Sequence, residues 1–337
     1  MKNTIVLFLA LIVFAFGLSS CESTMTPSPN NTTFTDSTLF IVSEGNYGKN
    51  NAELDGYSLK KDSLSKDIIN PLGDIANDIQ IFGKRMYVLL ENSNKILNVK
   101  PDSIADRTSI QFTAGVTPFK MARVSPSEVW VTEFTGNHID IMNLNSNSLV
   151  SSISVDTGQT DIGILGGKAF ICTNANKLEV IDVQTRQVLS NKYLNDYPSQ
   201  VITDSAHNAV IVLTSGSSTK DPGKIFWIDP ATYNTTFSLA IDTLTYVNSI
   251  VPAGSKAFIL YGDKVGALDL AAKSVTTLIA KGYYKGLYDA TTNQLILGDA
   301  KDYSSPGVVD IYNATSGQLL KSIPSGIIPG HFAIYRK

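Results

Sequence analysis

The sequence predicts an all-β fold, a seven-bladed β-propeller, on two observations. A short apolar segment recurs seven times, in steps of 47, 43, 40, 41, 47 and 38 residues. Its centres are Phe40, Tyr87, Trp130, Phe170, Ile211, Phe258 and Ile296. No long amphipathic helix pattern separates them, and strand signals repeating every ~40–50 residues are typical of propeller blades. Because blades bury their faces only against one another, we expect one domain over residues 38–337.

Each repeat has the same order of elements. An inner strand, such as residues 76–81, precedes the apolar second strand, with a polar turn between them. The third strand ends in Asp or Asn followed by Thr or Ser, as at Asp182 with Thr185 and Asp229 with Thr232. Such a short polar side chain accepts hydrogen bonds from the backbone just ahead of it. We therefore interpret these residues as turn formers rather than metal ligands.

The two ends of the repeat region complement each other. The first segment, residues 39–42, is a second strand with no inner strand before it. The last, residues 331–335, is an inner strand with nothing after it. We expect the C-terminal strand to pair with the N-terminal blade and close the ring, because closure removes the open sheet edges.

The N-terminus has the pattern of a bacterial lipoprotein signal. Lys2 precedes an apolar stretch over residues 5–18, and Leu18-Ser19-Ser20-Cys21 resembles a lipobox. We expect residues 1–20 to be a signal peptide, Cys21 to be lipidated and residues 21–37 to be a flexible tether. The anchor would be lipid alone, without a membrane span. An ordinary secretory signal with an incidental cysteine is the alternative.

Composition argues against several function classes. The formal net charge is −3 and no Lys/Arg run stands out, so we expect no nucleic-acid binding. Cys172 lies in an apolar strand and is predicted to be a core residue. With three histidines (His138, His207 and His331) and no nucleophile-elbow, zinc-protease, P-loop or dinucleotide motif, we expect no catalytic residues and no cofactor.

The loops on one face of the ring carry the candidate binding residues. Loops after second strands and before inner strands meet there, around the axial channel. Their aromatic, amide and carboxylate side chains suit a bulky, polar, partly planar small molecule or a protein partner. The candidates are Glu44, Asn46, Tyr47, Asn77, Glu91, Asn92, Glu133, Phe134, Asn174, Tyr197, Tyr246, Tyr284, Asp299 and Tyr303.

Four of these candidates occupy equivalent positions in their blades: Glu44, Glu91, Glu133 and Asp299. We expect them to form an arc of acids at the channel mouth, either solvated or holding a cation. Whether a metal binds there stays open at this point.

The opening of the repeat region resembles a known family. Residues 39–48, Leu-Phe-Ile-Val-Ser-Glu-Gly-Asn-Tyr-Gly, followed by Asn51-Ala52-Glu53-Leu54 and by Asp78-Ile79 before Met86-Tyr87-Val88, are similar to YncE-like, YVTN-type propeller lipoproteins of Bacteroidota. The resemblance covers about residues 38–337. It implies a lipid-anchored protein at the outer membrane or cell surface that partners a TonB-dependent outer-membrane transporter. In one branch of the family it implies cobalamin capture, which makes a corrinoid a candidate ligand.

Two further functions remain open. One is a propeller enzyme, a hydrolase, lactonase or lyase, that uses the loop carboxylates and a bound cation. The other is an interaction scaffold without a small ligand. The leading expectation is a non-enzymatic surface lipoprotein that binds a ligand or a transporter partner through its loop face.

Overall fold

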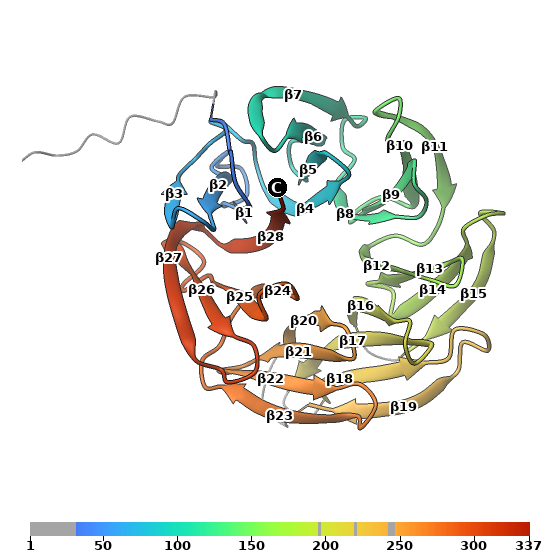
Figure 1. Cartoon of the computed structure of the whole chain (residues 1–337). Coiled ribbons are helices and arrows are strands. Elements are labelled where there is room, and N and C mark those ends of the chain that lie inside the picture. The colour runs from blue at the N-terminus through green and yellow to red at the C-terminus, as the bar shows by residue number, and fades with distance from the viewer. Residues whose placement is uncertain (1–31, 195–196, 219–220, 242–246) are drawn as a thin grey trace, which may run out of the picture.

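The chain forms seven four-stranded antiparallel sheets arranged in a ring, in a computed structural model that describes residues 32–194, 197–218, 221–241 and 247–337 (Figure 1). Within these residues there is no helix, and hence none that is long and apolar enough to cross a membrane. Each sheet contributes an inner, a second, a third and an outer strand, from the axis of the ring to its rim. The predicted seven-bladed β-propeller is confirmed.

In each of the first four blades, the strands are named in order from the axis outward. The first blade holds β28 (Pro329–Tyr335), β1 (Thr38–Ser43), β2 (Glu53–Ser58) and β3 (Ser63–Ser65). The second holds β4 (Ala76–Phe82), β5 (Arg85–Leu90), β6 (Lys95–Lys100) and β7 (Ser103–Gln111). The third holds β8 (Pro118–Arg123), β9 (Glu128–Glu133), β10 (His138–Asn143) and β11 (Ser148–Ser154). The fourth holds β12 (Gln159–Leu165), β13 (Lys168–Thr173), β14 (Lys177–Asp182) and β15 (Val188–Tyr193).

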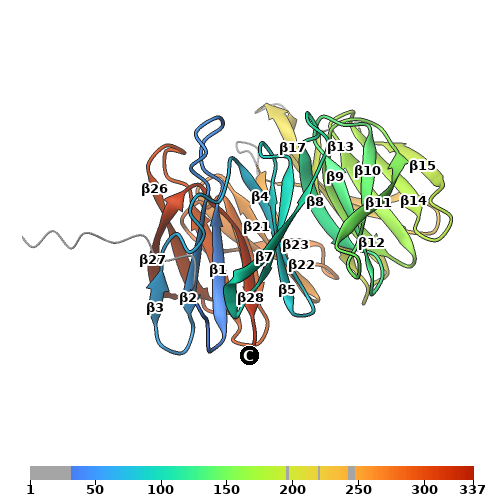
Figure 2. The same cartoon turned by 90° about the horizontal axis from the view of Figure 1, so that it is seen from above.

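The remaining three blades continue in the same order. The fifth holds β16 (Pro198–Asp204), β17 (Ala209–Ser218), β18 (Asp221–Ile228) and β19 (Thr235–Ala240). The sixth holds β20 (Val247–Ala253), β21 (Lys256–Tyr261), β22 (Lys264–Asp269) and β23 (Ser274–Ile279). The seventh holds β24 (Lys285–Asp289), β25 (Gln294–Asp299), β26 (Pro306–Asn313) and β27 (Leu319–Ile327). Seen edge-on, the strands run between the two faces of the ring (Figure 2).

The hydrophobic core lies between neighbouring blades. The seven apolar centres found in the sequence all fall in second strands, and strand alternation sends their neighbours to opposite faces. On β9, Trp130 belongs to a core cluster with Ile171 of the fourth blade, whereas Val131 belongs to a cluster with Leu89 of the second. Cys172 is fully buried in such an interface, and burial raises the pKa of its thiol, as a core residue requires.

The Asp residues that end the third strands form the predicted turns. Asp182 Oδ1 accepts hydrogen bonds from the backbone N–H of Thr185 at 2.7 Å and from its hydroxyl at 2.9 Å. Asp229 makes the same pair of contacts with Thr232, at 2.7 and 3.0 Å. These donors lower the pKa of both carboxyls. Their role as turn formers is confirmed.

The ring closes as expected. β28 pairs antiparallel with β1, with Ala333 opposite Phe40 and Phe332 opposite Ile41. The C-terminal segment thereby supplies the inner strand that the N-terminal blade lacks (Figure 1). All six residues of β1 are buried because both edges of the strand are paired.

The end of the predicted tether belongs to the folded body. Phe34 is buried, and its ring meets the edge of Phe40 at a centroid distance of 5.3 Å. Gly56 makes room for it, since a Cβ at that position would lie 2.3 Å from Phe34 Cζ. The expectation that residues 21–37 are all flexible is therefore wrong for residues 32–37, because one large aromatic side chain suffices to dock them. The predicted signal peptide, Cys21 and the rest of the tether lie outside the described residues.

Removing residues 328–337 tests ring closure. The deletion takes away β28 and exposes both the edge of β1 and the apolar surface that Phe332 and Ala333 cover. Loss of several buried apolar side chains, each contributing about 2–5 kcal/mol, would exceed a typical free energy of unfolding of about 5–15 kcal/mol. We expect no cooperative thermal transition by circular dichroism. Deleting residues 336–337 alone is the control, and a 328–337 deletion that melts like the full chain would contradict closure.

Candidate functional site

Each inner strand places one side chain at the axis, and every inner strand except β24 of the seventh blade also carries a bulge. The pairing register shifts in β12 between Gln159 and Asp161, and comparable shifts mark five further inner strands among those described. A bulge adds one residue to a strand and re-aims its side chains. The set at the axis, which we call the axial ring, consists of Asp78, Lys120, Asp161, Gln200, Ser249, Lys285 and His331.

A cavity of about 520 Å³ lies on the loop face of this ring. Loop residues Glu44 and Tyr303 line it, and so does Ser215 near the end of β17. Ring residues Lys120 and Lys285 also line it. Its walls come from the residues that precede the ring positions in the inner strands: Asn77, Phe119, Thr160, Ser199, Asn248 and Tyr284. A second hollow of about 280 Å³ continues along the axis, and all seven ring residues line it. The volume suits a small molecule.

His331 connects the first blade to the cavity. Its Nε2 lies 3.0 Å from Glu44 Oε1, and its Nδ1 lies 3.4 Å from Lys120 Nζ. Burial and the charge of Lys120 lower the imidazole pKa, so the ring is neutral at pH 7. The tautomer that fits donates from Nε2 to Glu44 and accepts at Nδ1 from Lys120. Tyr284 donates its hydroxyl to Glu44 Oε2 at 3.3 Å.

Two lysines bring positive charge to the cavity. Lys120 Nζ donates to the carbonyl of Asn77 at 2.7 Å, and Lys285 Nζ donates to that of Asn248 at 3.4 Å. Neither forms an ion pair with any carboxylate of the described residues. Burial and repulsion from Lys120 lower the pKa of Lys285 to about 8. A carbonyl leaves each ammonium with further donors for a ligand.

The acids of the axial ring are occupied by backbone donors. Asp78 Oδ2 accepts from Met121 N–H and Asp161 Oδ2 from Val201 N–H, each at 2.9 Å and each across a blade boundary. Burial raises the pKa of Asp161 to about 6. Both acids line the lower hollow and neither lines the larger cavity. The cavity therefore presents its cationic groups rather than these acids.

Aromatic pairs flank the cavity on two sides. Phe119 stacks on Phe134 with a centroid distance of 5.2 Å, and Tyr284 meets the edge of Tyr303 at 5.6 Å. Phe119, Tyr284 and Tyr303 all line the cavity. Flat apolar surfaces of this kind accept a planar group with little loss of side-chain entropy.

Some of the candidates predicted from sequence lie at the cavity or next to it, and others lie apart from it. Glu44, Asn77, Tyr284 and Tyr303 line the cavity. Next to it, Asn46 donates a hydrogen bond to the carbonyl of Tyr303 at 2.9 Å, and Glu91 accepts one from the Asn77 side chain. Phe134 stacks on Phe119. Burial, with Glu44 and Asp74 nearby, raises the pKa of Glu91 to about 7.

Other candidates lie apart from the cavity. Asn92 donates to Asp74 Oδ2 at 2.6 Å, and Asn174 covers Gly158, where a Cβ would lie 2.0 Å from its Cγ. Tyr47 and Tyr197 are solvent-exposed, Asp299 pairs with Lys281 at 2.8 Å, and Tyr246 lies outside the described residues.

The four equivalent acids do not form one arc. Glu44 and Glu91 are electrostatic neighbours, but Glu133 is fully buried and Asp299 pairs with its own lysine. Strand alternation explains Glu133, since it shares a face of β9 with Val131, which packs on the second blade. Equivalent sequence position therefore did not ensure an equivalent side-chain direction.

Lys120, Lys285 and Phe119 were missed from the sequence. A signal for them exists, because an aromatic-Lys pair recurs at the start of two inner strands, as Phe119-Lys120 and Tyr284-Lys285. In β8 the bulge between Pro118 and Met121 interrupts simple alternation, so the sequence does not tell which of Phe119 and Lys120 points to the axis.

The fold is that of a β-propeller, with an axial cavity at its loop face. Among solved structures it is similar to a chain of Kuenenia stuttgartiensis hydrazine synthase, at 14% identity and TM-score 0.66 over 78% of this chain and 95% of that one. It is also similar to the Pan2 WD40 domain of Neurospora crassa, at 12% identity and TM-score 0.61 over 77% and 82%. These likenesses show the fold alone. No protein family model and no curated protein matches the sequence.

Replacing Lys285 by Met tests whether the buried positive charge of Lys285 destabilises the folded protein. The pKa of Lys285 is about 8 in the folded protein and about 10.4 in an unfolded chain. A cation whose pKa falls on folding opposes folding below pH 8, and this effect disappears as pH rises toward 10. We expect Lys285→Met to raise the melting temperature at pH 7 by about 2–4 °C, or about 1 kcal/mol.

The advantage of Lys285→Met should vanish at pH 10, measured by circular dichroism at both pH values. Lys84→Met, at an exposed lysine in the turn after β4, is the control and should change neither value. A Lys285→Met variant that is less stable than the parent at pH 7 would show that Lys285 supports the fold instead.

Proposed function

We propose that the protein is a non-enzymatic binding protein that takes a small organic anion into its axial cavity. Lys120 and Lys285 would hold the anionic group, and Phe119, Tyr284 and Tyr303 would contact a planar body. The observation that carries this proposal is the pair of neighbouring ammonium groups that face a cavity without a described carboxylate as ion-pair partner.

Electrostatics favours an anion over a neutral or cationic ligand. With His331 neutral, the charged groups that line the cavity are Lys120, Lys285 and Glu44, a net excess of one positive charge at pH 7. The repulsion that lowers the pKa of Lys285 would be relieved by a bound carboxylate or phosphate. Perturbed pKa values in a concave site are typical of functional residues.

The setting we propose follows the family resemblance. The protein would be anchored to the outer membrane or cell surface through a lipid on Cys21, with its loop face available to a TonB-dependent transporter. A corrinoid is one candidate ligand, and its phosphodiester could engage the two lysines. Residues 21–31 would then be the spacer between lipid and propeller, since residues 32–37 are docked on the body.

A matched pair of flavins tests the anion requirement. Flavin mononucleotide and riboflavin share one planar ring and differ by a phosphate that carries about −1.5 to −2 charges at pH 7. We expect flavin mononucleotide to bind at least tenfold more tightly in calorimetric titrations, since a charge-assisted hydrogen bond contributes about 1.5–3 kcal/mol. Lys120→Gln and Lys285→Gln should each remove most of that difference, while Lys84→Gln should not.

Cyanocobalamin forms a second arm of the same titration, with the same three variants. Equal affinity for the two flavins, or affinities that Lys120→Gln and Lys285→Gln leave unchanged, would rule out anion capture in this cavity. Corrinoid binding that depends on Lys120 and Lys285 would support the extended proposal.

Anion binding should depend on pH. Because the pKa of Lys285 is about 8 in the free protein, the cavity loses a positive charge as pH rises from 7 to 9. We expect the affinity for flavin mononucleotide to fall severalfold over this interval, at constant ionic strength. Lys285→Gln should lack this dependence, because it carries no titrating group at that position. A flat profile in the parent protein would contradict the assignment.

A further inference from the structure

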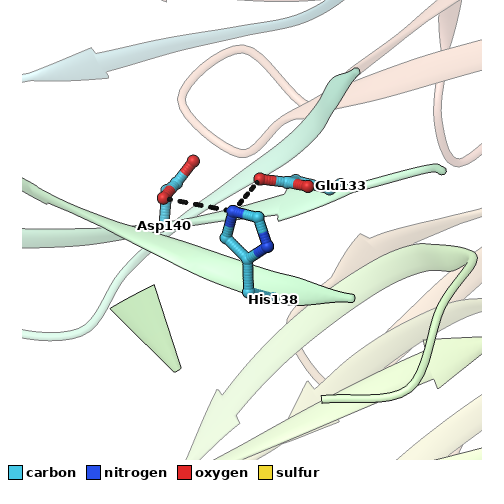
Figure 3. A group of neighbouring side chains, drawn as sticks. All are labelled: Glu133, His138 and Asp140. Atoms are coloured by element: carbon cyan, nitrogen blue, oxygen red, sulfur yellow. Dashed lines mark ion pairs between the residues drawn. The ribbon is translucent and has the colours of Figure 1, made fainter. Parts of the chain in front are cut away.

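A histidine and two carboxylates lie close together at the loop-face end of the third blade. Glu133 ends β9, and His138 and Asp140 lie on the same face of β10, directly beside it (Figure 3). His138 Nε2 lies 2.8 Å from Glu133 Oε1 and 3.7 Å from Asp140 Oδ1. Ligand-type atoms of all three residues lie within 4.8 Å of one another. No step of the proposed anion binding uses this cluster.

Glu133 is a buried carboxylate without an adequate partner. Its side chain is 1% exposed, and neither oxygen accepts a well-formed hydrogen bond from the described residues. The close approach of His138 Nε2 therefore does not have hydrogen-bond geometry. An unsatisfied buried carboxylate is expensive, and a bound cation would compensate for it.

The second ring nitrogen of His138 has the partner that a metal ligand needs. His138 Nδ1 lies 3.4 Å from Asn137 Oδ1, which can only accept a hydrogen bond. This contact favours the tautomer with the proton on Nδ1, which leaves the Nε2 lone pair directed toward Glu133 and Asp140 (Figure 3). Metal-bound histidines are oriented by such an acceptor.

We propose that Glu133, His138 and Asp140 bind a divalent transition-metal ion of the zinc class, with one coordination position left open to solvent.

The spacing and the donor set both favour zinc over calcium or magnesium. Ligands at about 2.0–2.1 Å from a tetrahedral zinc ion lie about 3.3 Å from one another, and the observed separations of 2.8 and 3.7 Å bracket that value. Calcium prefers six to eight oxygen ligands and magnesium keeps most of its water, so neither gains from an imidazole. Imidazole with carboxylates is a common zinc environment.

Three protein ligands leave a fourth position for water or a ligand. That position is accessible, because the His138 side chain is 32% exposed although Glu133 is not. This arrangement requires glycine at position 136, since a Cβ there would lie 1.5 Å from Glu133 Oε2. The segment from β9 to β10 therefore supplies the three proposed ligands and also the glycine that leaves space for the Glu133 side chain.

Calorimetric titration of the chelator-treated full chain with ZnCl₂ tests the proposal. We expect one saturable zinc site per chain, and a stabilisation that grows with free zinc by mass action. His138→Ala should weaken zinc binding at least tenfold. Co²⁺ should occupy the same site and give the visible absorption of a low-coordinate ion, whereas 1 mM CaCl₂ or MgCl₂ should not compete.

Two further variants separate the site from general surface binding. Gly136→Ala keeps all three ligands but displaces the Glu133 carboxylate, so zinc affinity should also fall severalfold or more. His207→Ala is the matched control, because His207 lies 2.6 Å from Asp204 but belongs to no three-ligand cluster in the described part of the chain. It should bind zinc like the parent.

Circular dichroism establishes that each variant is folded before titration. The proposal is overturned if the parent shows no saturable zinc binding, if zinc binding survives His138→Ala, or if His207→Ala abolishes it equally.

Discussion

The pairing of β28 with β1 is the constraint on which the other features depend. It places His331 opposite Val42 and brings Glu44 into contact with a side chain 287 residues away in the sequence. The backbone N–H of Glu44 also donates to the carbonyl of Ile328 at 2.9 Å, just before β28. The cavity thus has a complete wall only in the closed ring, and the free sheet edges disappear in the same step.

The axial ring combines mechanical and chemical roles. Asp78, Asp161 and Gln200 accept backbone hydrogen bonds from the next blade, at 2.8–2.9 Å, and so tie neighbouring blades together at the axis. Lys120 and Lys285 also donate across blade boundaries to carbonyl oxygens, Lys120 donates to His331 as well, and each ammonium retains a further donor. Blade cohesion and the proposed ligand capture therefore use different members of one ring, and the electrostatic cost appears in the lowered pKa of Lys285.

The third blade connects the two proposed sites. Phe134 follows Glu133 directly, and it stacks on Phe119 in the wall of the axial cavity. Lys120, the residue after Phe119, is one of the two proposed anion-binding lysines. A metal ion at Glu133, His138 and Asp140 would fix the end of β9 from which Phe134 extends. One short segment thus positions a metal-ligand set on one blade face and an aromatic wall at the axis.

Much of the fold was determined by the sequence alone. The period of the apolar strands set the number of blades, the unpaired strands at the two ends set ring closure, and residues such as Asp182 set the turns. These features are local or periodic, so they are visible in one chain read from end to end. The same reading placed Glu44, Asn77, Tyr284 and Tyr303 on the loop face, where they line the cavity.

Tertiary structure alone decided which side chains share a site. The bulge in β8 turns Lys120 to the axis, against simple alternation, and ring assembly brings Lys285 of β24 to the same cavity. The packing of β9 on the second blade buries Glu133 away from the channel mouth. The His138 cluster depends on the register of β9 with β10, and the docking of Phe34 depends on the space at Gly56. Register, bulges and packing arise between strands, so residue identities along one strand do not encode them individually.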